Sequence, residues 1–220
     1  TPKTGDYAPT LWTWDFGDWT ATSSIQDPLH TYQMAGYHTV SMTAWNMTDA
    51  GNTTDTETKT DYIRVNMSAN FTADPESGDA DLPVQFNDTT LGMPTNWTWD
   101  FGDWTNTSSE QDPLHTYFMA GNHTVTLTAW NETDVANTTD TKTGNILVNM
   151  SANFTAAPRS GDAPLDVLFN DTTLGMPTMW NWSFGDGTWD NTTQNPTHQY
   201  VDGGVFTVML IASNGTFTDT

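Results

Sequence analysis

Apolar and polar residues alternate along short stretches of this chain, which is the pattern of β-strands with one buried and one exposed face. In HTVTLTAWN (123–131), Val125, Leu127 and Ala129 share one face, and threonines occupy the other. The alternation occurs twice more, with apolar positions at Val40, Met42, Ala44, Val208, Leu210 and Ala212. Each stretch therefore predicts a half-buried strand of a two-sided sheet.

A second alternating stretch carries much of the aromatic area. In NWTWDFGD (96–103), Trp97, Trp99 and Phe101 share one face and polar residues share the other. Burying one such side chain contributes roughly 1.5–3 kcal/mol to folding. Shorter strands are predicted at 70–73, 83–88 and 145–149, with Gly, Pro, Asn and Asp between them. Because helix signals are nearly missing, the predicted fold class is all-β, with short strands packed as β-sandwiches.

The chain is a tandem array of one small domain. WTWDFGDWT at 12–20 returns unchanged at 97–105 and returns as WNWSFGDGT at 180–188, offsets of 85 and 83 residues. One repeat is therefore about 84 residues, enough for a single core. The predicted domains are 1–66, which lacks its N-terminal part, 67–149, which is complete, and 150–220, which lacks its C-terminal part. We expect a segment of a longer array.

The joints between repeats contain no flexible linker. NILVNMSANFTA (145–156) leads from the last strand of one repeat into the first strand of the next without a Gly/Ser run. Short connections restrict bending, which predicts a semi-rigid rod of sandwiches. The Thr/Asn/Asp-rich segments 46–61 and 131–144 are predicted to be exposed loops or a protruding hairpin.

Charge and composition exclude several partners. The net charge is −22, from 27 acidic and five basic residues, which argues against binding nucleic acid or anionic membrane surfaces. No cysteine is present, so the sequence has neither disulfides nor a cysteine-containing metal site. No apolar run is long enough to span a bilayer, so direct membrane insertion of this segment is not expected.

Three motifs in fixed order identify a family resemblance. W-x-W-D-F-G-D, then D-P-x-H-x-Y, then G-x-H-T-V-x-L-T-A together resemble the PKD domain, in three copies that cover essentially the whole chain. The resemblance implies an immunoglobulin-like β-sandwich, with the WDFGD strand central and the P-x-H-x-Y segment structural. It also implies extracellular, non-enzymatic roles as spacers, adhesion modules or parts of archaeal surface-layer glycoproteins.

N-x-S/T sequons are the strongest chemical signal. Of 18 asparagines, 16 lie in sequons, which predicts heavy N-glycosylation, most securely at Asn46, Asn52, Asn131 and Asn137. A Thr- and Asn-rich β-protein also makes sequons by composition alone. The remaining candidate sites are Asn66, Asn70, Asn87, Asn96, Asn106, Asn122, Asn149, Asn153, Asn170, Asn181, Asn191 and Asn214.

Catalytic and metal signals are weak. DFGD contains a kinase-like triplet but lacks the phosphate loop and other kinase motifs, and it recurs in every repeat, so no catalytic residue is predicted. No cofactor other than calcium is expected, and the metal-binding residues are unknown. Calcium is a candidate because Asp and Asn oxygens are abundant in loops. The aspartates of suitable type and loop position are Asp79, Asp81, Asp88, Asp103, Asp162, Asp171 and Asp186.

Three loop tryptophans are candidate contact residues. Trp19 and Trp104 stand where the family often has glycine after FGD, and only the third repeat keeps glycine, at Gly187. Trp189 lies in the same region of the third repeat. The favoured interpretation is that these rings fold back over the sandwich edge. The alternative is that they are exposed and stack on sugars or on a neighbouring subunit.

These observations favour a non-enzymatic extracellular structural protein. The first hypothesis is a glycosylated surface layer, sheath, stalk or filament that self-associates into a polymer or lattice, including a variant in which one chain completes the next. The second is an adhesin or carbohydrate-binding module that uses the loop tryptophans. The third is a non-catalytic spacer of a larger secreted enzyme.

Overall fold

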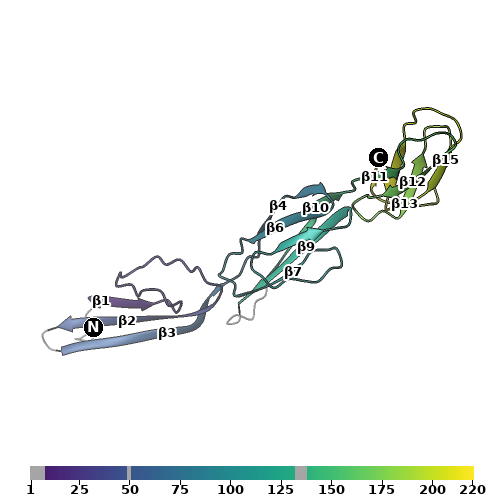
Figure 1. Cartoon of the computed structure of the whole chain (residues 1–220). Coiled ribbons are helices and arrows are strands. Elements are labelled where there is room, and N and C mark those ends of the chain that lie inside the picture. The colour runs from purple at the N-terminus through teal and green to yellow at the C-terminus, as the bar shows by residue number, and fades with distance from the viewer. Residues whose placement is uncertain (1–7, 49–50, 132–137) are drawn as a thin grey trace. The chain divides into compact units, whose positions relative to one another are not determined.

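The computed structural model describes residues 8–48, 51–131 and 138–220, and every regular element in those ranges is a β-strand (Figure 1). This confirms the all-β prediction. The chain forms two compact units. One comprises Thr1–Phe71, Thr89–Thr98 and Leu127–Asp140, and the other comprises Thr72–Asp88, Trp99–Thr126 and Thr141–Thr220, so the second repeat is divided between them.

The third repeat is a two-sheet sandwich. One sheet has the order β11 (Phe154–Ala157), β12 (Leu165–Asp171), β15 (Thr197–Tyr200). The other has the order β14 (Trp189–Asp190), β13 (Met179–Ser183), β16 (Met209–Ser213), β17 (Thr218–Asp219). Both sheets contribute to one core, because Val167 and Phe169 of β12 cluster with Trp182 of β13 and Leu210 of β16.

The second repeat also has two sheets. These have the orders β4 (Phe71–Asp74), β6 (Leu82–Asp88), β8 (Leu114–Tyr117) and β5 (Ser77–Asp79), β10 (Thr138–Asn149), β9 (Gly121–Trp130), β7 (Asn96–Asp100). The Phe86 ring on β6 lies 5.5 Å from Trp99 and 5.3 Å from Phe101, centroid to centroid. The sequence pattern missed β5, which pairs in parallel with the end of β10.

The first repeat has a single sheet in its described part, with the order β1 (Leu11–Asp15), β2 (Gly36–Thr48), β3 (Gly51–Val65). Strands β2 and β3 form a long antiparallel hairpin, so the segment 46–61 is the predicted hairpin rather than a loop. The sequence LHTY is strand β8 at 114–117 but is not a strand at 29–32. A strand needs a partner: β8 pairs with β6, whereas 29–32 pairs with no strand among the described residues.

The predicted faces are largely confirmed in the second repeat. Along β9, Val125, Leu127 and Ala129 are fully buried and alternate with half-buried neighbours. Trp99 and Phe101 are buried, whereas Trp97 is only half-buried. The strongest apolar signal therefore identified the core strands correctly.

His38 and His123 align with Phe206 of the third repeat, which predicts that they are packing residues, and both are buried. His123 is buried and its ring stacks on Tyr117 at 4.7 Å. Its Nε2 contacts the backbone carbonyl of Met119 at 3.0 Å. The equivalent Phe206 stacks on Tyr200 at 4.3 Å.

Each segment that joins successive repeats contains a buried methionine. Met67 and Met150 are 4% and 5% exposed. Met150 clusters with Ala120 and Ala212, and the Ala120 amide donates to the Gly175 carbonyl at 3.1 Å. The domain limits and the semi-rigid rod remain predictions.

Candidate functional site

One tight turn recurs in all three repeats and is held by identical contacts. We call it the FGD turn, and it comprises residues 16–20, 101–105 and 184–188. Its glycine has a positive φ, +73° at Gly102, and a Cβ added there would lie 2.2 Å from the carbonyl oxygen of Thr124. Only glycine fits this position, because both the dihedral and the close backbone approach exclude a side chain. Gly17 and Gly185 have the same surroundings.

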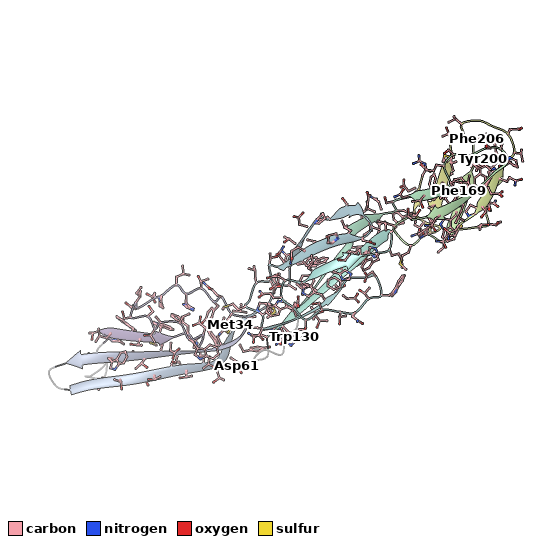
Figure 2. All side chains as sticks on the ribbon, viewed as in Figure 1. Met34, Asp61, Trp130, Phe169, Tyr200 and Phe206 are labelled. Atoms are coloured by element: carbon pink, nitrogen blue, oxygen red, sulfur yellow. The ribbon has the colours of Figure 1, made fainter. Side chains whose placement is uncertain are left out.

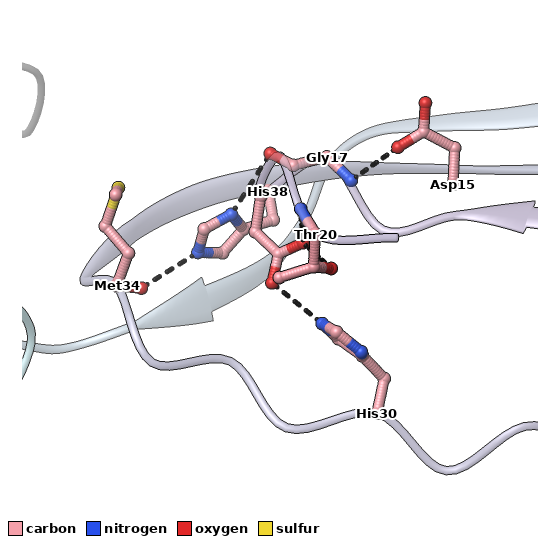
Figure 3. A network of polar contacts seen from close by, with 7 residues as sticks. Asp15, Gly17, Thr20, His30, Met34 and His38 are labelled. Carbon is pink, nitrogen blue, oxygen red and sulfur yellow. Dashed lines mark hydrogen bonds and ion pairs between the residues drawn. The ribbon is translucent and has the colours of Figure 1, made fainter. Parts of the chain in front are cut away.

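The aspartate of the FGD turn binds two partners. In the second repeat, Oδ1 of Asp103 accepts hydrogen bonds from the backbone N–H and the hydroxyl of Thr105, at 3.2 and 2.6 Å. Oδ2 lies 2.8 Å from Nε2 of His115, which donates because an ionised carboxylate can only accept. The equivalent pairs are Asp18–His30 at 2.7 Å, drawn in Figure 3, and Asp186–His198 at 2.7 Å.

The histidine is fixed by stacking as well as by its hydrogen bond. The His115 ring lies parallel to Phe101, with centroids 4.0 Å apart and planes within 3°. The corresponding separations are 3.9 Å for Phe16–His30 and 4.1 Å for Phe184–His198. This Asp–His pair was not predicted from the sequence. The constant separation of 12 residues in every repeat is the signal that could have revealed it.

The contacts stabilise the ionised form of the aspartate. Burial of the Asp103 carboxyl raises its pKa, but hydrogen bonds from threonine and histidine outweigh burial, and the net pKa lies below the usual value. The pKa of Asp18 is lowered by the same balance. At Asp186, the hydrogen bond from the Thr188 side chain is the largest cause, and the pKa falls to about 2.

This constellation is arranged for structure rather than for nucleophilic catalysis. In a catalytic triad the histidine lies between the nucleophile hydroxyl and the carboxylate. Here the carboxylate of Asp103 lies between the Thr105 hydroxyl and His115, so the histidine is not placed to remove the hydroxyl proton. The same Asp–Thr contact recurs in the first and third repeats, as expected of an element that stabilises each domain.

The tryptophans of the FGD turn are exposed and conformationally strained. Trp19 and Trp104 both have φ of +60° and are 84% and 91% exposed. A bulky residue in the left-handed region costs about 1–2 kcal/mol, and exposing the ring adds no burial to offset that cost. Neither ring folds back over the sandwich edge, so the exposed alternative is the observed one. Gly187 takes this place in the third repeat, with φ of +89°.

Trp189 occupies a different position. With the offset of 83 residues it aligns with Asn106 rather than with Trp104. It lies on β14, which pairs with β13, and it is 59% exposed. The three tryptophans are therefore all accessible, but only two share a turn geometry.

The sequons differ in accessibility. Asn131, expected in an exposed loop, is 4% exposed, and its amide nitrogen lies 3.4 Å from the Met93 carbonyl, which corrects that expectation. Asn46, Asn96, Asn181 and Asn214 are half-buried. Asn137 lies outside the described residues, and the Asn52 side chain is likewise not described. The exposed sequon asparagines are Asn66, Asn70, Asn87, Asn106, Asn122, Asn149, Asn153, Asn170 and Asn191.

The candidate calcium ligands are not gathered into one site. Within residues 8–48, 51–131 and 138–220, no group of three or more His, Cys, Asp or Glu side chains is placed to hold a metal ion. Asp103 and Asp186 bind Thr and His instead, and Asp171 accepts from the Trp180 indole at 2.7 Å. Calcium binding remains an untested prediction.

In the described part of the chain, no helix is long and apolar enough to cross a membrane.

Comparison with known proteins identifies the repeated unit. The PKD domain model matches residues 2–65, 66–146 and 149–220. The chain belongs to the PKD domain family. Human polycystin-1 is 27% identical over 214 residues, which are 93% of this chain but only 5% of polycystin-1.

Two solved structures align with lower similarity. One comes from a study of the promiscuous specificity of carbohydrate-binding modules of the β-sandwich superfamily. It is 16% identical, has a TM-score of 0.34, and the match covers 69% of this chain and 86% of that chain. The other contains the three N-terminal domains of the outer capsid protein Hoc of bacteriophage RB49. It is 16% identical, has a TM-score of 0.33, and the match covers 86% and 67% of the two chains.

Proposed function

We infer that this PKD array is a non-enzymatic, N-glycosylated structural segment of an extracellular surface layer, sheath, stalk or filament, of the kind that archaeal surface glycoproteins build. The observation that carries this proposal is the threefold recurrence of the FGD turn with the same hydrogen bonds and ring stack. A site that catalyses a reaction is usually built once, whereas a module that sets spacing is repeated with unchanged geometry.

The surface properties support an extracellular assembly. A net charge of −22 keeps separate chains soluble and disfavours nucleic acid as a partner. Exposed sequons in the second and third repeats supply attachment points for glycans, for example Asn70 and Asn153. Self-association through repeated surfaces would then build the polymer.

Electron microscopy of native material tests this function. An ordered lattice or fibre with a repeat that scales with the number of PKD domains is the expected result. Dispersed particles under native ionic conditions, together with dispersed particles after glycan removal, would contradict the assembly role. A recombinant unglycosylated chain is the matched control, because it separates assembly by protein surfaces from assembly by glycans.

A specific observation also favours a second candidate, a carbohydrate-binding or adhesion role. Exposed Trp19 and Trp104 are retained at strained backbone positions where glycine is the unstrained choice, and strain of this kind often marks a contact site. An indole ring stacks on the apolar face of a sugar ring. Glycan-array binding that disappears in the W19G/W104G double variant and persists in L114S, which removes another exposed apolar side chain, would support it.

A further inference from the structure

Three tryptophans of this chain leave most of the indole ring in water. They are Trp19, Trp104 and Trp189, whereas the other tryptophans are buried or half-buried, such as Trp130, which Figure 2 labels. An exposed indole forgoes the free energy that its burial would supply. At Trp104 the backbone φ of +60° adds strain. An exposed ring on a strained backbone points to a contact outside the polypeptide fold.

Two of these tryptophans stand two residues before a sequon asparagine. Asn106 follows Trp104 in the segment WTNTS, and Asn191 follows Trp189 in the segment WDNTT. Both asparagines are exposed, as both rings are. No other sequon of the chain has tryptophan at this position. The spacing therefore occurs only where the ring and the glycan acceptor are both open to solvent.

The tryptophan and the asparagine keep their spacing when their place in the repeat changes. In the second repeat, Trp104 and Asn106 come two and four residues after the FGD glycine. In the third repeat, Gly187 takes the first of these positions, and Trp189 and Asn191 come four and six residues after the FGD glycine. A ring and an acceptor that move together along the chain are expected where the two act together.

The local backbone holds the ring and the asparagine within reach of each other. Two residues of chain span at most about 7 Å, which limits the distance between the Cα atoms of Trp104 and Asn106. The FGD aspartate binds the amide of Thr105 between them. Just beyond them, Ser108 and Trp99 exchange two backbone hydrogen bonds, of 2.8 and 3.2 Å. The first sugar on Nδ2 of Asn106 would therefore begin beside a positioned indole ring.

We propose that the indole rings of Trp104 and Trp189 are stacking platforms for the first sugars of the glycans on Asn106 and Asn191 of the same chain. This inference rests on the N-glycosylation in the proposed function and deepens it, because it assigns a ligand to each of these two rings. The C–H face of the sugar covers the indole and removes apolar surface from water. The contact also fixes the direction in which each glycan leaves its domain.

The first repeat supplies a matched control. Its segment WTATS differs from WTNTS only at Ala21, which is exposed. Trp19 has the same φ as Trp104, and Trp14 and Ser23 exchange the same two backbone hydrogen bonds. The ring of Trp19 therefore has the same setting without an asparagine two residues later, and it stays open to an external ligand.

The test measures nuclear Overhauser contacts between indole protons and the C–H protons of the first sugar, in the 220-residue chain produced in a host that attaches N-linked glycans. Contacts are expected at Trp104 and should be lost in N106Q and in W104G. Mass spectrometry records the occupancy of Asn106 in each sample. A glycosylated Asn106 without these contacts would overturn the inference and leave the proposed function standing. Unmodified Asn106 and Asn191 in native material would overturn the inference through the glycosylation on which it rests.

A gain of the site completes the test. The A21N variant acquires the WTNTS sequence and should fold as the parent does, because Ala21 is exposed. Its new glycan should contact Trp19, which has no such contact in the parent chain. The W19G/A21N double variant should carry the glycan without the contact. A glycan attached in A21N that makes no contact with Trp19 would overturn the inference.

Discussion

At the residue scale, two tryptophans of the same repeat have different roles, one in folding and one at the surface. Trp99 and Trp104 are five positions apart, yet Trp99 is fully buried and donates its indole N–H to the Glu110 carbonyl at 2.9 Å, whereas Trp104 is 91% exposed. Trp99 is therefore a core residue and Trp104 is a surface residue. Their contributions to folding should therefore differ in size and even in sign.

We predict that W104G leaves the free energy of unfolding within about 1 kcal/mol of the parent. Relief of about 1–2 kcal/mol of left-handed strain is offset by the extra flexibility of glycine in the unfolded chain. W99A should instead lose about 3–5 kcal/mol, because it empties a buried site. Urea denaturation of the two variants measures the contrast. A loss above about 2 kcal/mol for W104G would show that the exposed ring has a folding role.

The Asp186 carboxylate should make stability depend on pH in an acidic window. Its folded pKa is about 2, below the usual value of 3.8, so the folded state binds fewer protons than the unfolded state between these values. Its stabilising effect is therefore full above about pH 4 and is lost as the pH falls towards 2. The difference in unfolding free energy between the parent and D186N should shrink over that window. A difference that stays constant from pH 5 to pH 2 would contradict the assignment.

At the element scale, pairing partners decide whether a segment becomes a strand. Ser77–Asp79 has no apolar alternation, yet it forms β5 because the end of β10 pairs with it. The equivalent residues 160–162 form no strand. The FGD turn behaves differently, because its contacts are local and it forms in every repeat.

The FGD glycine should therefore be intolerant of substitution. G102A is predicted to lose at least about 2 kcal/mol, since the new Cβ would meet the Thr124 carbonyl oxygen at 2.2 Å in a left-handed backbone. G187A is the matched control: φ is also positive there, but nothing lies within 4 Å, so about 1 kcal/mol is expected. Thermal unfolding of both variants gives the comparison, and equal losses would remove the clash as the explanation.

At the scale of the whole molecule, accessibility should set the pattern of glycosylation. Most of the exposed sequons lie at strand ends and outward strand positions, for example Asn87 and Asn170 after the last core residue of β6 and β12. By contrast, Asn131 is buried against a backbone carbonyl. We therefore expect glycans on this array to lie outside the sheets, where they leave the sheet interiors for packing.

Mass spectrometry of native material should find glycan mass at Asn70, Asn87, Asn153 and Asn170, and unmodified peptide at Asn131. The physical reason is that a glycan on a buried amide nitrogen would have to break the contact with Met93. Unmodified peptides at all four exposed sites would contradict glycosylation as a general property of the array. Modification of Asn131 would instead show that glycan transfer precedes folding of this segment.

The sequence by itself determined the repeat, the all-β class and the identity of the core, because periodicity and self-similarity are written along the chain. Val125, Leu127, Trp99 and Phe101 are buried as their alternation requires. Part of the candidate site was also predictable, since Trp19 and Trp104 occupy the position that Gly187 holds in the third repeat. The sequence favoured rings folded back over the sandwich edge, and that interpretation was wrong, because both rings are exposed.

Only the tertiary structure decided which segments find partners. LHTY is a strand at 114–117 and not at 29–32, although the letters are identical, because hydrogen bonding in a sheet depends on a neighbour remote in sequence. The Asp103–His115 contact has the same origin: the loop must close before the two side chains meet.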